Sequence, residues 1–337
     1  MASGTVSVLV LLVLVYIGSE GLRWFDAALA PYLFGTLLAV FATVYRYVVW
    51  LRRPPTALLN QRGWQAFKRR GHRGRNTLAL GGMVVTNLAL QLFIKGRSTT
   101  RWVAHQLIFW GCILAALVTF PLTFGWFHFR SVDDTGQMYQ AYLGPMATLT
   151  FDSRSLVGFI VFHLLNIAAI LVIGGVVIFL VRRFRDRGAI ALERVGDFAA
   201  LAGLFAVSIT GLMMTASSLW MEGRFYSFLN ILHALTVVLG LLYIPFGKLF
   251  HILQRPANLG VAFYKRQGTE GPAQICTECG DGYASAMQIT DLKTVLPQVG
   301  FDYSTAAGGN YQDICPRCRR RLVGSAQEMR LRTEARD

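Results

Sequence analysis

Six stretches of this chain are apolar enough to cross a lipid bilayer. They cover residues 5–19, 28–51, 102–127, 155–181, 197–218 and 227–252. A helix needs about 20 predominantly apolar residues to span the hydrocarbon core, and the first stretch is the one that falls clearly short of this length. Backbone polar groups in lipid must be satisfied within the element itself, so such segments fold as helices. The sequence therefore predicts an all-α, polytopic membrane bundle of about six transmembrane helices.

The composition agrees with this class. Hydrophobic residues make up 54% of the 337 residues and charged residues only 15%, against about 25% in an average soluble domain. The net charge of +15 would suggest nucleic acid in a soluble protein. Here the Lys and Arg residues gather at the ends of the apolar stretches, which is typical of a membrane protein. We therefore expect the lipid bilayer as partner, and no nucleic acid.

The links between the stretches differ in charge. The link 51–75 carries eight Lys or Arg residues and the link 182–194 carries five, whereas the links 19–27, 128–154 and 219–226 together hold four Arg beside six acidic residues. Positive residues concentrate on the cytoplasmic side. The pattern predicts a multi-pass protein of a bacterial-type cytoplasmic (inner) membrane, with both termini in the cytoplasm.

The stretch 78–94 is apolar but is flanked by Arg75 on one side and by Lys95, Arg97 and Arg101 on the other. A span here would place one basic flank outside. We therefore expect an interfacial helix on the inner membrane face; the alternative is a seventh span, which would move the C-terminal region outside. Residues 1–253 are then the transmembrane part, and residues 254–337 a cytoplasmic extension and tail.

Histidines supply the clearest indication of chemistry. Five of the six lie in the apolar stretches or at their ends: His105, His128, His163, His233 and His251. A histidine in hydrocarbon is costly and usually functional. His233 and His251 are 18 residues apart on one predicted helix, which is five turns and about 27 Å. Both would lie on one helix face, one near each membrane surface, as two haems stacked between helices require.

Matching the depths of the histidines pairs them. His251 and His105 both lie near cytoplasmic ends and would ligate an inner haem. His233 and His163 each lie about two turns from an outer end and would ligate an outer haem. Two axial imidazoles leave no open position on the iron, which suits electron transfer. His128 is the alternative to His163, or else it lies where a quinone headgroup would exchange a proton. If neither serves, the chain holds one haem, through His105 and His251.

Two segments carry a family resemblance. Residues 233–259, HALTVVLGLLYIPFGKLFHILQRPANL, resemble the last haem-binding helix of respiratory nitrate reductase gamma subunits, with His233, Pro245, Lys248 and His251 at matching positions. Residues 101–111, RWVAHQLIFWG, resemble the first haem helix of that family and of the membrane cytochromes of heterodisulfide-reductase-like complexes. The resemblance covers roughly residues 100–260. It departs at Ala115, where the family pattern has a second histidine, so His163 rests on depth matching alone.

The resemblance implies a di-haem cytochrome b subunit that anchors a quinone-linked oxidoreductase. Electrons would pass between the quinone pool and a cytoplasmic iron–sulfur subunit, joined to a catalytic subunit that in the nitrate reductase case holds molybdenum. The chain has no P-loop, no HExxH and no serine-nucleophile elbow, so we expect an electron-transfer subunit rather than a stand-alone enzyme. Two other classes stay open, namely a proton-coupled transporter with a histidine relay and a non-redox membrane anchor.

Basic residues near the inner histidine pair have two interpretations. Arg101, Lys248 and Arg255 would neutralise haem propionates at the low-dielectric boundary. Alternatively, they belong to the ordinary positive charge of the cytoplasmic side.

Four cysteines form two knuckles. Cys276-Thr-Glu-Cys279 and Cys315-Pro-Arg-Cys318 give the CxxC…CxxC pattern of a tetrahedral thiolate site. In a reducing cytoplasm a metal is favoured over disulfides. We expect structural zinc, which would make the extension a docking platform; the alternative is rubredoxin-like iron, which would make it an electron relay.

Overall fold

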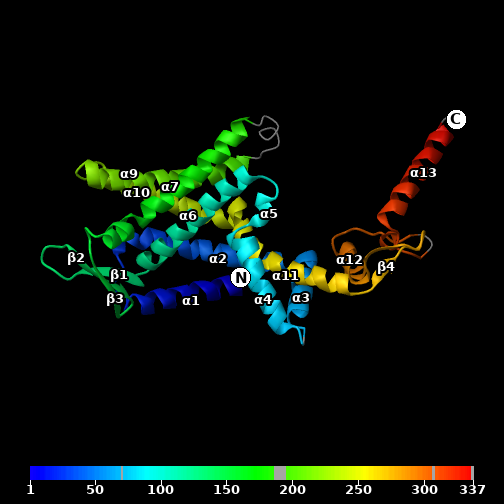
Figure 1. Ribbon diagram of the computed structural model, residues 1–337, viewed down its shortest axis with the longest axis horizontal. Coiled ribbons are helices and arrows are strands. Elements are labelled where there is room, and N and C mark those ends of the chain that lie inside the picture. The colour runs from blue at the N-terminus through cyan, green and yellow to red at the C-terminus, as the bar shows by residue number, and fades with distance from the viewer. Residues whose placement is uncertain (70, 186–194, 306–307, 335–337) are drawn as a thin grey trace. The chain divides into compact units, whose positions relative to one another are not determined.

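The computed structural model describes residues 1–69, 71–185, 195–305 and 308–334 (Figure 1). Of the basic residues in the links 51–75 and 182–194, Arg70, Arg187 and Arg194 lie outside the described residues. The described chain is mostly helical. Its contacts divide it into two compact units, one made of Met1–Val48 and Val85–Leu253 and the other of Val49–Val84 and Gln254–Asp337. We call them the membrane unit and the second unit.

The predicted polytopic helical bundle is confirmed. Five helices in the described residues are long and apolar enough to cross a membrane: α2 (Ala30–Arg52, extended by the short helix η1, Ala27–Leu29), α6 (Thr99–Thr123), α7 (Leu156–Arg185), α9 (Val195–Trp220) and α10 (Tyr226–Phe246). The first predicted span is helix α1 (Ala2–Gly18), which has only 17 residues. That length is about 25 Å, short of a core about 30 Å thick.

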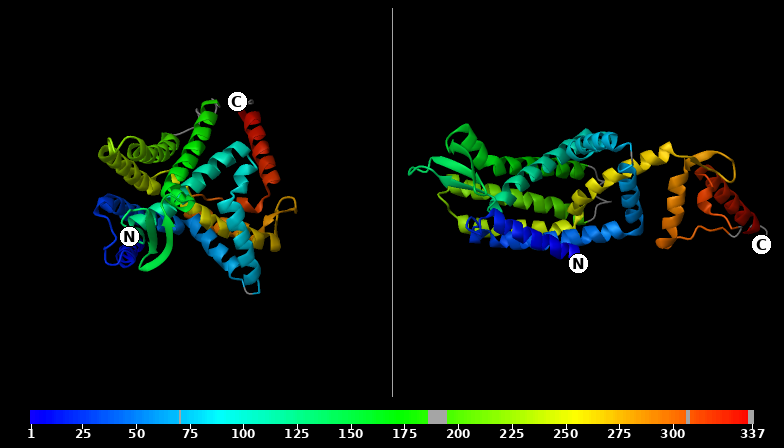
Figure 2. Two further views of the ribbon diagram at one scale, coloured as in Figure 1. Left: turned by 60° about the vertical axis from the view of Figure 1, so that its left-hand side comes forward. Right: turned by 90° about the horizontal axis from the view of Figure 1, so that it is seen from below.

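Small residues let the central helices of the bundle approach closely. A Cβ at Gly175 on α7 would lie 2.6 Å from the carbonyl oxygen of Ala104 on α6, and one at Gly111 would lie 2.8 Å from that of Ala168. Helix α9 packs on both α7 and α10, and these helices run side by side in Figures 1 and 2. Close backbone approach at small residues is typical of membrane helix pairs.

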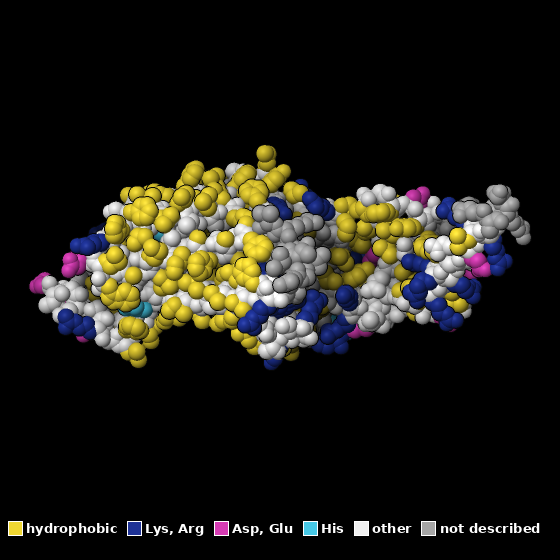
Figure 3. Space-filling model, turned by 90° about the horizontal axis from the view of Figure 1, so that it is seen from above, with side chains coloured by type: hydrophobic (Ala, Val, Ile, Leu, Met, Phe, Trp, Pro, Cys, Tyr) yellow, Lys and Arg dark blue, Asp and Glu magenta, His cyan; other side chains and the backbone are white. Residues whose placement is uncertain are grey.

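The outward faces of these helices are apolar. Exposed side chains include Leu117 on α6, Phe159 and Ile170 on α7 and Leu235 on α10, and Figure 3 shows apolar side chains over the bundle. Exposing such a surface to water would be costly in free energy, whereas lipid is a matching solvent for it.

A three-stranded antiparallel sheet follows α6 and was not predicted. Its strands are β1 (Phe127–Ser131), β2 (Met138–Leu143) and β3 (Met146–Asp152), in the order β1-β2-β3. The predicted stretch 102–127 therefore ends early, because α6 stops at Thr123 and Gly125 adopts a φ of +71°. A positive φ suits glycine and breaks the helix.

The sixth predicted span is not one helix. Helix α10 ends at Phe246, Gly247 is extended, a short helix η3 covers Lys248–Phe250, and α11 (His251–Glu270) begins at His251. A Cβ at Gly247 would contact the far end of the Tyr243 side chain, so glycine lets this ring lie against the break. The prediction that His233 and His251 share a straight helix, five whole turns apart, is therefore wrong.

The stretch 78–94 is also broken. Helix α4 (Arg73–Met83) passes into a π-helical turn η2 (Val84–Ala89), and α5 (Leu92–Lys95) begins after Gln91, whose φ is +49°. Trp102 donates its indole N–H to the Leu90 carbonyl at 2.6 Å. This bond satisfies a backbone group that the break leaves without a helical partner. The prediction of one continuous interfacial helix is corrected accordingly, and among the described residues this stretch is not a candidate span.

The second unit joins the link after α2 to the C-terminal region. It contains α3 (Pro54–Phe67), α4, most of α11, the hairpin β4 (Ala273–Ile275) and β5 (Gly282–Ser285), α12 (Ala286–Gln298), the turn η4 (Tyr311–Asp313) and α13 (Pro316–Glu334). Asp291 on α12 is buried, and its carboxylate accepts from Arg62 on α3 at 2.8 Å and from Tyr264 on α11 at 3.0 Å. This buried charge is stable because both its neighbours donate to it.

Candidate functional site

His105 on α6 and His251 at the start of α11 face each other in the membrane unit. Their ring centres lie 6.5 Å apart, with an angle of 75° between the ring planes. The Nδ1 of His251 lies 2.6 Å from the Lys248 carbonyl oxygen. A carbonyl can only accept, so Nδ1 of His251 carries a proton and donates it to Lys248. A ligating histidine is usually oriented by a second-shell contact of this kind.

The separation of the two rings fits one metal ion between them. An imidazole–metal bond is about 2.0–2.1 Å, and the ring centre lies about 1.1 Å behind the ligating nitrogen. Two imidazoles on opposite sides of one ion would therefore have centres about 6.3 Å apart, close to the 6.5 Å observed. The structure thus brings together the two histidines that the sequence paired for the inner haem.

An arginine from a distant helix holds the segment before His251. Arg46 on α2 donates to the Pro245 carbonyl, and its guanidinium carbon lies 4.3 Å from the centre of the Phe250 ring. Arg46 lies near the C-terminal end of α2, six residues before Arg52. It covers the break between α10 and α11, a role that no local pattern could reveal because the two segments are about 200 residues apart.

The outer pair, His163 and His233, is not in ring contact within the described residues. Each lies seven residues into its helix, since α7 begins at Leu156 and α10 at Tyr226. The Nδ1 of His163 donates to the Phe159 carbonyl at 3.0 Å. Both histidines therefore lie equally far from the start of their helices, and the two helices have α9 as a common neighbour.

His233 is tied to α9. Its Nδ1 lies 2.9 Å from the Thr210 hydroxyl oxygen, and that hydroxyl donates to the Ala206 carbonyl at 2.7 Å. The hydroxyl proton is thus in use, so His233 donates from Nδ1. The Nδ1 atoms of His163, His233 and His251 are thus all engaged in hydrogen bonds, so Nε2 is the nitrogen that each could offer to a metal.

His128 lies in β1, outside the spans. Its ring is sandwiched between Trp24 (4.2 Å between centres, 8° between planes) and Tyr142 (5.1 Å, 1°). Arg130 lies over the Trp24 ring at 4.1 Å. Burial, followed by the charge of Arg130, lowers the pKa of His128. The ring is therefore held neutral in an aromatic stack, between Tyr142 of the sheet and Trp24 of the link after α1.

Two of the residues predicted to contact propionates are in helical register with the inner histidines. Arg101 precedes His105 by four residues on α6, and Arg255 follows His251 by four residues on α11. Residues four apart lie on one helix face. Lys248 contributes the carbonyl that orients His251.

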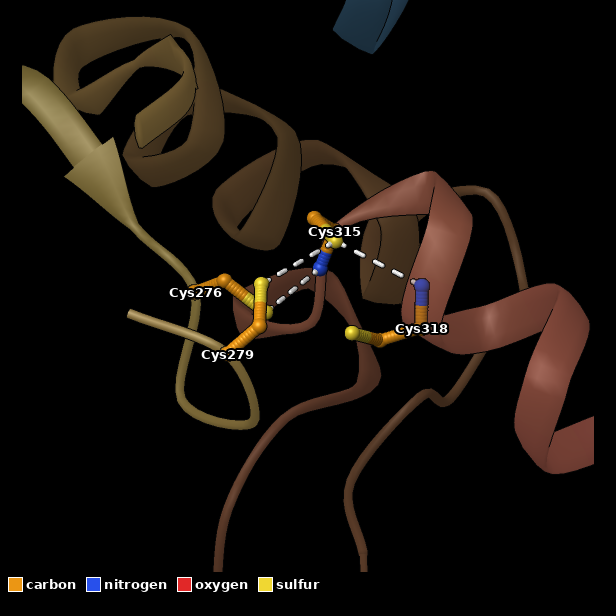
Figure 4. Close-up of side chains that lie close together, drawn as sticks. All are labelled: Cys276, Cys279, Cys315 and Cys318. Carbon is orange, nitrogen blue, oxygen red and sulfur yellow. Dashed lines mark hydrogen bonds between the residues drawn. The ribbon is translucent and has the colours of Figure 1, made fainter. Parts of the chain in front are cut away.

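The four cysteines form one cluster. The sulfur atoms of Cys276, Cys279, Cys315 and Cys318 all lie within 4.8 Å of one another (Figure 4). Cys279 and Cys315 are 3.8 Å apart, and a tetrahedral ion with bonds of about 2.3 Å to sulfur needs edges of about 3.8 Å. The predicted pairing of the two knuckles is therefore matched by geometry that could hold a metal such as zinc.

Local turns orient these four thiols toward one another. Gly280, with a φ of +74°, follows the first knuckle between β4 and β5, and the second knuckle opens α13 with Pro316 in its first turn. Backbone N–H groups point at sulfur, such as that of Cys315 toward Cys276 at 3.2 Å. Burial opposes ionisation of Cys276, but the backbone N–H groups around it lower the pKa of this thiol to about 6.

A second layer of polar contacts braces the cluster. Lys293 on α12 pairs with Asp313 at 2.5 Å, and the Asp313 carbonyl accepts from the Thr277 N–H at 3.1 Å. Arg319 donates to the Ile314 carbonyl at 2.7 Å. Arg319 therefore turns inward and acts as a structural group.

The comparisons with known proteins give no match to a family model, to a curated protein or to a solved structure. The resemblance over residues 100–260 accordingly stays a prediction.

Proposed function

We propose that this chain is a cytochrome b-type membrane-anchor subunit that transfers electrons between quinone and an iron–sulfur subunit on the cytoplasmic side. The observation that carries the proposal is the facing pair His105 and His251. Two segments 146 residues apart in the sequence bring their imidazoles to the separation that one metal ion would span. Histidines facing each other in an apolar bundle are costly unless they have a partner to bind.

The chain's own residues define what they would do for a bound haem. His105 and His251 would be its axial ligands, with the Lys248 carbonyl orienting His251 and raising its basicity. Arg101 and Arg255, each one turn from a ligand, would neutralise the propionates together with Lys248. The surrounding apolar helices keep the site dry. A haem bound there would supply one-electron iron chemistry.

A second haem is proposed at His233 with His163, because each lies seven residues after the start of its helix and has its Nδ1 engaged in a hydrogen bond, which leaves Nε2 to face a metal. His128 is the alternative partner. Quinone would then react near the outer side. Replacement of His163 by Ala should remove one haem per chain, whereas His128→Ala should remove none. The opposite result would make His128, and not His163, the partner of His233.

The cysteine cluster is proposed to hold zinc and to stabilise a platform on which the iron–sulfur subunit docks. Zinc has no redox chemistry, so this role is structural; iron in its place would make the cluster a relay. By its resemblance, the chain would serve a molybdenum enzyme of the nitrate reductase type or a heterodisulfide-reductase-like complex in a bacterial-type inner membrane, with both termini in the cytoplasm.

The test is a visible absorption spectrum of the full chain purified from membranes, first oxidised and then reduced with dithionite. We expect sharp reduced bands of a b-type cytochrome. Pyridine haemochrome analysis then counts haems, two per chain if both histidine pairs bind and one if only the inner pair does. A featureless spectrum would contradict the proposal and favour a transporter or a non-redox anchor.

A further inference from the structure

Four of the nine residues that line a hollow on the second unit are basic. It lies between the end of α3, the start of α4 and the C-terminal half of α11. Arg69, Arg75 and Arg266 contribute guanidinium groups, His72 an imidazole and Glu270 the one carboxylate. The positive charges of the arginines thus outnumber the negative charge by two, even with His72 neutral.

The frame around this hollow is well fixed. Asn76, also in its lining, is buried, and its side-chain amide donates to the carbonyls of Ala66 at 3.2 Å and Phe67 at 2.9 Å. These bonds hold the start of α4 against the end of α3. The rings of Phe67 and Phe263 meet edge to face at 5.4 Å and join α3 to α11. The basic groups therefore project from three helices that are already packed together.

Internal neutralisation of these charges is slight. Arg69 and Glu270 approach to 3.6 Å, but both side chains are about half exposed, and a pair of this kind contributes little. Within the described residues, Arg75 and Arg266 form no ion pair. Like charges held together in this way favour an anion from outside the chain.

We propose that this hollow binds the phosphate group of an anionic phospholipid. The planar fork of a guanidinium matches the geometry of phosphate oxygens, and several arginines converging from different helices are suited to one phosphate. Basic pockets beside membrane helices bind acidic lipid headgroups for this reason.

The choice of a lipid over a soluble phosphate rests on where the hollow is tethered. Helix α3 begins at Pro54, two residues after the membrane-spanning α2 ends at Arg52, and the chain passes between the two units three times. Trp64 on α3 is 55% exposed and Leu78 on α4 is 81% exposed. Exposed Trp and Leu beside basic residues are typical of a surface that lies at the lipid headgroups.

The test uses the full chain, purified in detergent and stripped of lipid. It is titrated separately with short-chain phosphatidylglycerol, with phosphatidylcholine of the same chain length and with inorganic phosphate, and binding is followed by native mass spectrometry and by the thermal midpoint. We expect phosphatidylglycerol to bind about tenfold or more tightly than phosphatidylcholine, and inorganic phosphate to give no comparable stabilisation.

Matched variants distinguish lipid binding in the hollow from attraction by positive charge elsewhere on the surface. The double variant Arg75→Gln with Arg266→Gln should weaken phosphatidylglycerol binding about tenfold or more. The control, Arg73→Gln with Lys265→Gln, makes the same charge change on the same two helices at residues that do not line the hollow, and it should leave binding within about twofold.

The variant Glu270→Gln removes the competing carboxylate and should tighten binding, a direction that misfolding cannot produce. Equal losses in the two double variants would overturn the proposal, since the effect would then be diffuse attraction. Stabilisation by inorganic phosphate as strong as that by phosphatidylglycerol would also overturn it and point to a soluble ligand.

Discussion

The guanidinium carbon of Arg46 lies 4.3 Å from the centre of the Phe250 ring, and the same group donates to the carbonyl of Pro245. One side chain of α2 thus covers the point where α10 ends and the segment leading to His251 begins. The last carbonyls of a helix have no partner within it, and in lipid an unsatisfied carbonyl costs several kcal/mol. Arg46 therefore positions His251 without touching it.

Replacement of Arg46 by Gln should lower the free energy of unfolding by about 1–2 kcal/mol, because a charged hydrogen bond and a cation–π contact are lost together. Thermal unfolding in detergent would measure this. Arg52→Gln, at the end of the same helix, is the control and should change stability little. Equal effects of the two substitutions would show that Arg46 acts only as one more cytoplasmic charge.

Removal of either inner ligand should abolish one haem entirely. His105→Ala and His251→Ala are expected to lose the same component of the reduced spectrum, and the double variant should lose no more than either single one, since two axial ligands serve one iron. His72→Ala is the control, because His72 lies in the second unit, and it should keep the full spectrum. Retention of the full haem content in His105→Ala would rule out the proposed inner site.

Close contact between α6 and α7 sets the position of His105. Gly175→Ala would place a methyl group 2.6 Å from the Ala104 carbonyl oxygen, one residue before His105, so the helices must separate. We expect a loss of about 1–3 kcal/mol in unfolding free energy, from overpacking, together with lower haem content. Gly203→Ala on α9 meets nothing within 4 Å and should be neutral or slightly stabilising. If both variants change stability and haem content alike, the close α6–α7 contact does not determine either property.

The cysteine cluster should carry one metal ion per chain. Cys315→Ser removes a buried ligand, and we expect it to lose the ion and to expose residues 273–318 to limited proteolysis, because a structural metal contributes folding free energy directly. Elemental analysis would identify zinc or iron. Cys112→Ser, in α6, should keep the metal. A metal-free wild-type chain with an unchanged protease pattern would count against the site.

Alkaline pH should weaken the second unit at Tyr264. Burial, and then the hydrogen bond to Asp291, raise the pKa of Tyr264 to about 12 from an ordinary value of 10.0. Because the pKa is raised, the contribution of the protonated Tyr264 hydroxyl to the free energy of unfolding is complete below pH 10. It is lost as the pH rises from 10 through about 12. Phenolate absorbance should show a component that titrates late and is lost in Tyr264→Phe. At neutral pH that variant should lose about 1 kcal/mol of unfolding free energy. An unchanged titration curve would contradict the assignment of the late component to Tyr264.

Several parts of the fold could be predicted because their signals are local. The apolar runs that became α2, α6, α7, α9 and α10 need no neighbour to be recognised, since a bilayer selects for length and hydropathy alone. The two cysteine knuckles are equally local, because Gly280 and Pro316 turn the chain beside each CxxC pair. The sheet β1–β3 was missed because its short strands lie between two long apolar runs and carry mixed side chains.

The membrane class and the CxxC spacing of the four cysteines follow from the sequence alone, because both are local patterns. Which side chains meet follows only from the packing of the helices. The rings of His105 and His251 lie close together although Gly247 separates α10 from the segment that carries His251, and Arg62 reaches Asp291 across 229 residues of chain. Such contacts depend on how helices pack, and packing is set by side-chain shape on several elements at once, which no local pattern contains.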